Sequence, residues 1–187
     1  MKIAVIIGSV RAVRHTESVA QYIHDIAARR EGEFSYELLD LAAFDVPLLT
    51  SPVHPMKANK QHDDANVQKW SDAVDSFDGF VFVTPEYNHG VPGAFKNAVD
   101  TLGPEWVGKP VAFVGHGSVG GVRAIEQWRQ IVSNFSMPIV RAEINFNAFS
   151  HWKDGAFAPE ERHEAEANTL LDALESLVAL HSREAVR

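Results

Sequence analysis

Three short runs of apolar residues constrain the fold more than any other feature of this chain. They cover residues 3–7, 80–83 and 111–114 and consist only of Val, Ile, Phe and Ala. Such continuous short runs are typical of strands that are covered on both faces. Two weaker runs, at residues 35–39 and 138–144, bring the predicted strands to five. The partial alternation of residues 35–39 predicts an edge strand.

Helical periodicity fills the intervals between these runs. Apolar residues recur at spacings of three and four within residues 19–27, 67–74, 94–102, 124–132 and 159–181. Strands that alternate with helices predict an α/β fold, in which a parallel sheet is wrapped on both sides and the crossovers are right-handed. We expect a single domain over residues 1–187. The irregular stretch 46–63 contains three prolines, and long ordered loops of this kind often border a site.

Composition excludes several classes of function. The 17 basic and 25 acidic residues give a net charge of −8, which argues against nucleic acid or a membrane as partner. The chain has no Cys, so any redox activity must come from a bound cofactor rather than from thiols. The first apolar run is too short for a signal or membrane segment, and we expect a cytoplasmic protein.

The turn after the first apolar run carries groups that suit a phosphate. Its hydroxyl and guanidinium groups come from Ser9, Thr16, Arg11 and Arg14. A helix is predicted to begin near Thr16, and a phosphate at a helix N-terminus gains from the unpaired N–H groups and the helix dipole. The alternative is a helix capped by Thr16 or Ser18, with both arginines in solvent. The turn is not a Walker sequence, because no Gly-Lys-Ser/Thr follows, and it is not a dinucleotide fingerprint, because Gly8 is its only glycine.

The turn after the run 80–83 has the sequence T-P-E-Y-N-H-G-V-P-G over residues 84–93. It presents backbone groups, the ring of Tyr87 and the amide of Asn88 at the carboxyl edge of the predicted sheet, where open parallel sheets bind ligands. These groups suit a planar heterocycle that forms hydrogen bonds. Pro92 lies near the start of the next predicted helix, where its missing N–H is tolerated.

The turn after the run 111–114 is rich in glycine. Gly115, Gly117 and Gly120 satisfy the dinucleotide pattern, and Glu143 lies about where a ribose-binding acid is expected, so an NAD site is a rival interpretation. That fingerprint normally opens its fold, and too few residues follow it here for a full dinucleotide domain. A turn that brings the backbone against the edge of a ring explains the same glycines.

The same turn contains a possible hydrolase nucleophile. Ser118 lies in a sequence close to a nucleophile elbow, and Asp154 and His163 follow in the order that a hydrolase needs. However, His116 stands where that strained turn requires glycine.

The nine histidines do not predict a metal site. Residues 163–167, which begin with His163, lack the second histidine of a zinc helix. The acids that follow His62 suit the start of a helix rather than a ligand set. We therefore expect no metal.

Together, the three turns resemble those of the NADPH-dependent FMN reductase family, which includes quinone, chromate and azo-dye reductases. The resemblance rests on G-S-V-R at residues 8–11, P-E-Y-N at 85–88, G-V-P-G-A-F-K-N at 90–97 and the glycine turn 117–121. It covers about residues 2–145, and residues 85–97 are its most specific part.

The resemblance implies a flavodoxin-like three-layer sandwich, α/β in class, with a five-stranded parallel sheet of strand order 2-1-3-4-5. It also implies bound FMN, with NADPH or NADH as co-substrate and a ping-pong transfer of electrons to a flavin, quinone or similar small-molecule acceptor. A homodimer or homotetramer is implied as well. We name no catalytic side chain, because the cofactor carries the chemistry.

The resemblance also implies which residues bind the cofactor. Ser9, Arg11 and Thr16 would hold the phosphate, Pro85, Glu86, Tyr87 and Asn88 would border the isoalloxazine and ribityl chain, and His116, Gly117 and Ser118 would approach the other edge of the ring. We add Arg14 to this set for its guanidinium group. Glu17 departs from the small polar group of many relatives, and a carboxylate is tolerated there only if it points away or pairs with Arg14.

The sequence is compatible with two other functions. The first is a flavodoxin-type electron carrier that binds FMN without turning over a pyridine nucleotide. Flavodoxins typically use a phosphate loop rich in Ser and Thr, whereas this turn carries two arginines. The second is the serine hydrolase that would use Ser118.

Overall fold

A sheet of five parallel strands in the order β2-β1-β3-β4-β5 forms the centre of the protein. The strands are β1 (Lys2–Ile7), β2 (Ser35–Asp40), β3 (Gly79–Pro85), β4 (Val111–Gly117) and β5 (Ile139–Asn147). The computed structural model describes residues 1–184, and each pairing within this sheet is parallel. The five predicted strands, the edge position of β2 and the flavodoxin-like strand order are confirmed.

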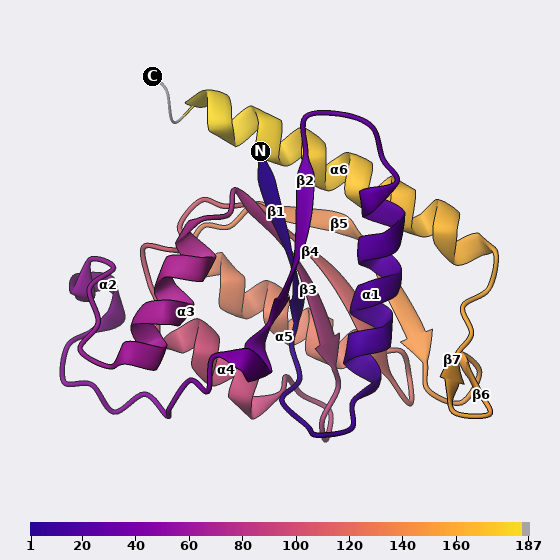
Figure 1. Cartoon of the computed structure of the whole chain (residues 1–187), viewed down its shortest axis with the longest axis horizontal. Helices are drawn as coiled ribbons and strands as arrows, with labels where there is room; N and C mark the ends of the chain where they lie inside the picture. Colours follow the sequence, from indigo (N-terminus) through magenta and orange to yellow (C-terminus); the bar gives the residue numbers. More distant parts are fainter. Residues whose placement is uncertain (185–187) are drawn as a thin grey trace.

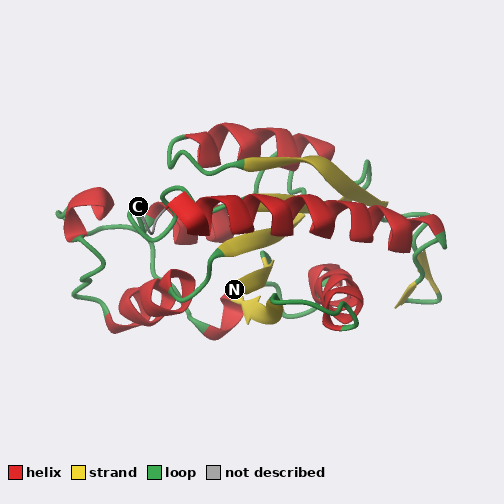
Figure 2. Ribbon diagram, turned by 90° about the horizontal axis from the view of Figure 1, so that it is seen from above, coloured by secondary structure: helices red, strands yellow, loops and turns green. Residues whose placement is uncertain are grey.

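Helices cover both faces of the sheet and make a three-layer sandwich (Figures 1 and 2). They are α1 (His15–Ala28), α3 (Ala65–Asp75), α4 (Gly93–Asp100), α5 (Val122–Ser133) and α6 (Arg162–Glu184). The first and last of them bury Ile3, Val5 and Ile7 of β1 on one face, and the other three pack against Ala4 and Ile6 on the opposite face. Because successive side chains of a strand point to opposite faces, two covered faces require a continuous apolar run.

Several short elements were not predicted. They are the 3₁₀ helix η1 (Leu41–Ala43), the helix α2 (Pro55–Ala58) and the hairpin of β6 (Trp152–Lys153) and β7 (Ala156–Phe157). The hairpin turns at Asp154 and Gly155, which both have positive φ, and an Asp-Gly pair is a recognised sequence signal for such a turn. Among the described residues, no helix has both the length and the apolar character needed to cross a bilayer.

Candidate functional site at the carboxyl edge of the sheet

Three loops meet at the carboxyl edge of neighbouring strands, at the lower rim of Figure 1. We call residues 8–16, after β1, the first corner; residues 84–93, after β3, the second corner; and residues 115–121, after β4, the third corner. Three hydrogen bonds connect them: Ser9 Oγ with the Tyr87 hydroxyl at 2.8 Å, Thr16 Oγ1 with His116 Nε2 at 2.8 Å, and the Glu86 amide to the His116 carbonyl at 3.1 Å. The structure therefore brings the three predicted turns together.

The first corner begins with a close approach of backbone to the next strand. The Gly8 amide donates to the Val83 carbonyl at 2.9 Å. A Cβ at Gly8 would lie 2.3 Å from a ring carbon of Phe95, so any larger residue would push this corner away from α4. Glycine is needed here for proximity.

The two arginines of the first corner have different roles. Arg14 donates to the Ser9 carbonyl at 2.8 Å and to Asp40 at 2.5 Å, and its Nε lies 3.6 Å from Glu17. Arg14 therefore stabilises the conformation of the first corner. Glu17 pairs with Arg14, which is one of the two arrangements that the sequence allowed for this carboxylate. Arg11 is exposed, and within the described part of the chain its side chain has no hydrogen bond or ion pair.

The first turn of α1 is left uncapped. Arg14 occupies the N-cap position in an extended conformation without a capping hydrogen bond from its side chain, and among residues 1–184 no other side chain accepts an amide of this first turn. The capping alternative for Thr16 and Ser18 is not observed, because Thr16 bonds to His116 and Ser18 donates to the His15 carbonyl. Free N–H groups at the start of a helix attract an anion, and the exposed Arg11 precedes the N-cap residue by three positions.

The second corner is a tight hairpin. Tyr87 and Gly90 exchange both backbone hydrogen bonds, at 3.0 and 3.1 Å, around Asn88 and His89, which have φ values of 51° and 66°. Two successive positive φ values are characteristic of a type I′ turn, and Asn is well suited to the first of these positions. Asn88 is exposed at the tip.

Gln127 of α5, which sequence reasoning missed, connects that helix to the second corner. It donates to the His89 carbonyl and accepts the Val91 amide, both at 3.1 Å. A lone glutamine on a helix gives no sequence signal for such a contact.

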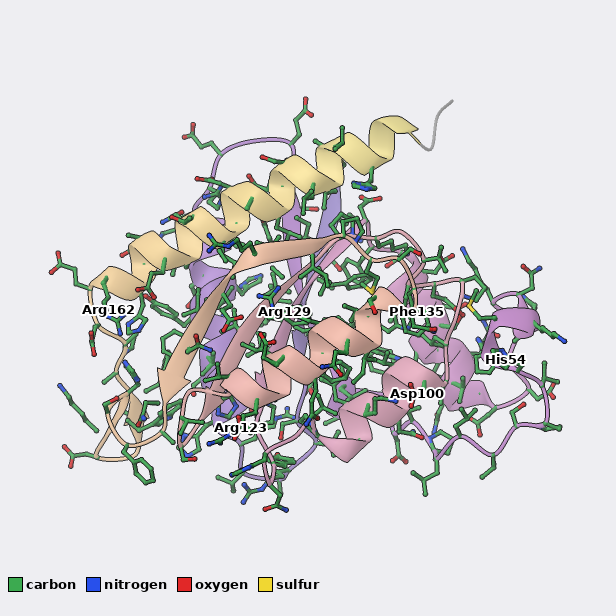
Figure 3. The ribbon with its side chains drawn as sticks, turned by 180° about the vertical axis from the view of Figure 1, so that it is seen from behind. His54, Asp100, Arg123, Arg129, Phe135 and Arg162 are labelled. Carbon is green, nitrogen blue, oxygen red and sulfur yellow. The ribbon has the colours of Figure 1, made fainter. Side chains whose placement is uncertain are left out.

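The carboxylate of Glu86 points at the N-terminus of α5. It accepts the Arg123 amide at 3.0 Å and pairs with the Arg123 guanidinium group at 2.6 Å, and only 5% of the Glu86 side chain is exposed. Figure 3 labels Arg123 at the beginning of this helix. Because the protein's own carboxylate lies where a dinucleotide pyrophosphate would bind, the rival NAD interpretation of the third corner is disfavoured.

Backbone conformation and close packing explain the glycines of the third corner. Gly120 and Gly121 have φ values of 80° and 78°, in the left-handed region. A Cβ at Gly115 would lie 2.6 Å from the Gly120 carbonyl. Glu143, the proposed ribose ligand of the rival interpretation, instead pairs with Arg129 at 2.8 Å.

His116 connects the third corner to the first and is 7% exposed. Burial, and secondarily the nearby His15, lower the pKa of His116 to about 4, so its imidazole is neutral at pH 7. The ring of Trp152, from β6, lies 4.5 Å from that of His15 and 5.9 Å from that of His116. The unpredicted hairpin thus forms a wall behind these two histidines.

Two cavities adjoin the long stretch 46–63. One, of about 270 Å³, borders the first corner and is lined by Val10, Leu41, Ala42, Asp45, Val46 and Ala94. The other, of about 500 Å³, is lined by residues of the segment 47–64 together with Val67 and Thr101, and no residue of the three corners lines it. The long loop therefore touches the edge of the site at its beginning and then builds a separate hollow.

The residues proposed for a hydrolase do not form a catalytic triad. His163 Nδ1 accepts the Glu160 amide at 2.9 Å. No hydrogen bond joins Ser118, Asp154 and His163 to one another in the part of the chain that the structure describes. A nucleophile and base must be within hydrogen-bond reach, so these residues do not form a hydrolase site.

The flavodoxin-like fold, with three loops gathered at the carboxyl edge of its sheet, defines the class of this protein. Comparisons with known proteins identify its family. The chain belongs to the NADPH-dependent FMN reductase family, whose pattern it matches over residues 1–151. It is 37% identical to the NAD(P)H-dependent FMN reductase ntnL of Nectria sp, over 94% of this chain and 93% of that protein. The family is one of oxidoreductases.

Solved structures agree on the fold. FerB from Paracoccus denitrificans, titled a flavoenzyme NAD(P)H:(acceptor) oxidoreductase, superposes with a TM-score of 0.70 at 22% identity, covering 96% of this chain and 98% of that one. A flavodoxin from Pseudomonas aeruginosa has a TM-score of 0.59 at 18% identity, with coverages of 94% and 99%. At these identities the likeness shows the fold alone.

Proposed function

We propose that this protein is an FMN-dependent NAD(P)H oxidoreductase that binds the flavin at the three corners and reduces a flavin, a quinone or a similar small acceptor. The observation that carries the proposal is an uncapped helix N-terminus beside the unpartnered Arg11, one strand away from the polar and aromatic second corner. Membership of the FMN reductase family supports FMN as the ligand.

The residues present fit the cofactor. The amides of the first turn of α1 and the Arg11 guanidinium group would bind the phosphate, and the hydroxyls of Ser9 and Thr16 lie in the same corner. Arg14 would support the phosphate site indirectly, since its guanidinium group already donates to the Ser9 carbonyl and to Asp40. Charge-assisted hydrogen bonds of this kind contribute roughly 1.5–3 kcal/mol each.

The second and third corners would hold the ring. The backbone at Pro85 and Glu86, the Tyr87 ring and the exposed Asn88 amide would border one side. The backbone of Gly117 and Ser118 would approach the other edge, with His116 behind them. Because His116 is neutral at pH 7, it would add no positive charge to this part of the site.

The protein's part in catalysis is to orient the two substrates. Bound FMN would supply the redox chemistry, accepting hydride from NADPH or NADH and passing electrons to the acceptor in a ping-pong cycle. We also propose that the chain acts as one FMN-binding domain, in a homodimer or homotetramer in the cytoplasm. Val13 and Phe149, which are 84% and 82% exposed, offer apolar surface for such contacts.

The first test is the colour of the purified protein and the mass of whatever it releases on heating. We expect a yellow protein that releases FMN, is bleached rapidly by NADPH or NADH, and is reoxidised by a quinone with turnover. A protein that stays colourless after soaking in excess FMN would refute the proposal. Bound FMN that a pyridine nucleotide does not bleach, but a separate reductase does, would favour the electron carrier instead.

A further inference from the structure

Two buried histidines and a glutamate meet at the base of the β6–β7 hairpin. His151 follows β5 and is 4% exposed, and His163, in the first turn of α6, is completely buried. Glu160 precedes that helix and is exposed to solvent. One donor atom from each of the three residues lies within 4.8 Å of the others. Figure 3 labels Arg162, the neighbour of His163, where α6 begins.

The histidines present unused nitrogen atoms. Nε2 of His151 and Nε2 of His163 are both buried, and neither has a hydrogen-bond partner in the described structure. His151 Nδ1 lies 3.1 Å from the Asn147 carbonyl and can donate to it, which leaves a lone pair on Nε2. A buried polar atom without a hydrogen-bond partner destabilises the fold, so two such atoms in one cluster need a physical explanation.

One pair of donor atoms in the cluster has the spacing of metal ligands. Glu160 Oε1 lies 3.3 Å from His151 Nε2, and this pair does not have hydrogen-bond geometry. Two ligands of a tetrahedral zinc ion with bonds of about 2.0–2.1 Å are themselves separated by roughly 3.3–3.4 Å. The carboxylate and the first imidazole therefore already have the separation of neighbouring zinc ligands.

We propose that His151, Glu160 and His163 form a binding site for Zn²⁺. Two imidazole nitrogens and one carboxylate are a donor set that zinc accepts, with a fourth position left for water, whereas Mg²⁺ and Ca²⁺ prefer oxygen ligands alone. The hydrogen bond from His151 Nδ1 to a backbone carbonyl is the usual support for a histidine that binds metal through Nε2.

His163 must shift its proton to take part. Its Nδ1 accepts the Glu160 amide at 2.9 Å and also lies 3.2 Å from the Glu160 carbonyl oxygen. Binding through Nε2 places the proton on Nδ1, which then donates to that carbonyl, while the Glu160 amide gives up its hydrogen bond to Nδ1.

This inference reverses the expectation of no metal, which rested on the missing second histidine of the helix. The fold supplies that histidine from the other end of the hairpin. None of the three residues belongs to the corners, so a test of zinc binding does not depend on whether the protein binds flavin.

The test is a calorimetric titration of the full-length protein, as purified, with Zn²⁺ alone. We expect one zinc ion per chain, and Glu160→Gln should weaken binding at least tenfold, about 1.4 kcal/mol. Because Glu160 is exposed, this variant should fold normally. Glu161→Gln is the matched control, since it makes the same change of charge one residue away and should leave zinc affinity unchanged.

Two results would overturn the proposal. One is the absence of saturable binding up to about 1 mM zinc. The other is equal affinity in Glu160→Gln and Glu161→Gln, which would mean that zinc binds to other surface groups. As a second measurement, zinc should raise the thermal unfolding temperature of the wild type more than that of His151→Gln, and an equal rise in both would also count against the site.

Discussion

The first and third corners both lead from a parallel strand into a helix, yet the two helices begin differently. At α5 the carboxylate of Glu86 accepts the Arg123 amide and fills the N-terminus with the protein's own charge. At α1 no side chain caps the first turn, and Arg11 beside it has no partner within the described residues. Since a helix N-terminus attracts negative charge from any source, this difference favours the first corner as the place for an external phosphate.

The largest predicted effect concerns His116, which links the third corner to the first. It is a loss of folding stability at acidic pH. His116, which bonds to Thr16, has a pKa of about 4 when folded and about 6.5 when unfolded. Between these values the unfolded chain binds a proton that the folded chain does not, so stability falls as the pH drops from about 6.5 to 4. The shift corresponds to about 3 kcal/mol as an order of magnitude.

Urea unfolding at a series of pH values measures this dependence. His116→Gln should flatten it, whereas His89→Gln, at an exposed histidine of the second corner, should leave it as in the wild type. If His116→Gln retained the full loss of stability on acidification, the buried imidazole would not be its source.

The next largest effect should come from Arg11→Ala. Loss of the free guanidinium group should weaken FMN binding at least tenfold, about 1.4 kcal/mol, measured by fluorescence titration of the flavin. Arg141→Ala removes the same charge from an exposed position on β5 and should not change the affinity. Equal affinities in the two variants would remove the first corner as the phosphate site.

Glu86→Gln tests the N-terminus of α5, where the protein's own carboxylate accepts the helix amide. Removing the charge from the start of α5 should lower the free energy of unfolding of the flavin-free protein by about 1 kcal/mol. Glu126→Gln is the control, because its carboxylate is exposed and 3.7 Å from Arg129, and it should change stability by less than about 0.5 kcal/mol. Similar losses in both variants would show that Glu86 does not stabilise the helix N-terminus.

The smallest effect should come from the hydrogen bond that joins the first and second corners. Tyr87→Phe and Ser9→Ala should each lower the free energy of unfolding by roughly 0.5–1.5 kcal/mol, because each removes the same bond. In a double-mutant cycle the combined variant should lose less than the sum of the two. Strict additivity in chemical denaturation would mean that the 2.8 Å contact contributes no coupling.

Much of the fold was predictable because it depends on local periodicity. The runs at residues 3–7, 80–83 and 111–114 had to be strands covered on both faces, and alternation with helices implied a parallel sheet. The ends of parallel strands lie at one edge, so the three turns could be expected to form one site. The family's strand order came from the resemblance of those turns rather than from periodicity.

The contacts within the site were not predictable in the same way. Nothing near Glu86 in the sequence indicates Arg123, and nothing near His163 indicates His151 as a neighbour, because each pair is joined only after the intervening chain has folded. The hairpin that places Trp152 behind His116 had a signal, the Asp154-Gly155 pair, but its strands are two residues long and carry no periodicity.

Residue order along this chain was enough to establish the layers, the strands and the edge where polar turns gather, since burial on one or two faces leaves a pattern in neighbouring residues. Which helix start is already filled, which arginine is free, and which histidines lie together became visible only in three dimensions. Those properties depend on distances between residues far apart in the chain, and a distance of that kind leaves no periodic trace in the sequence.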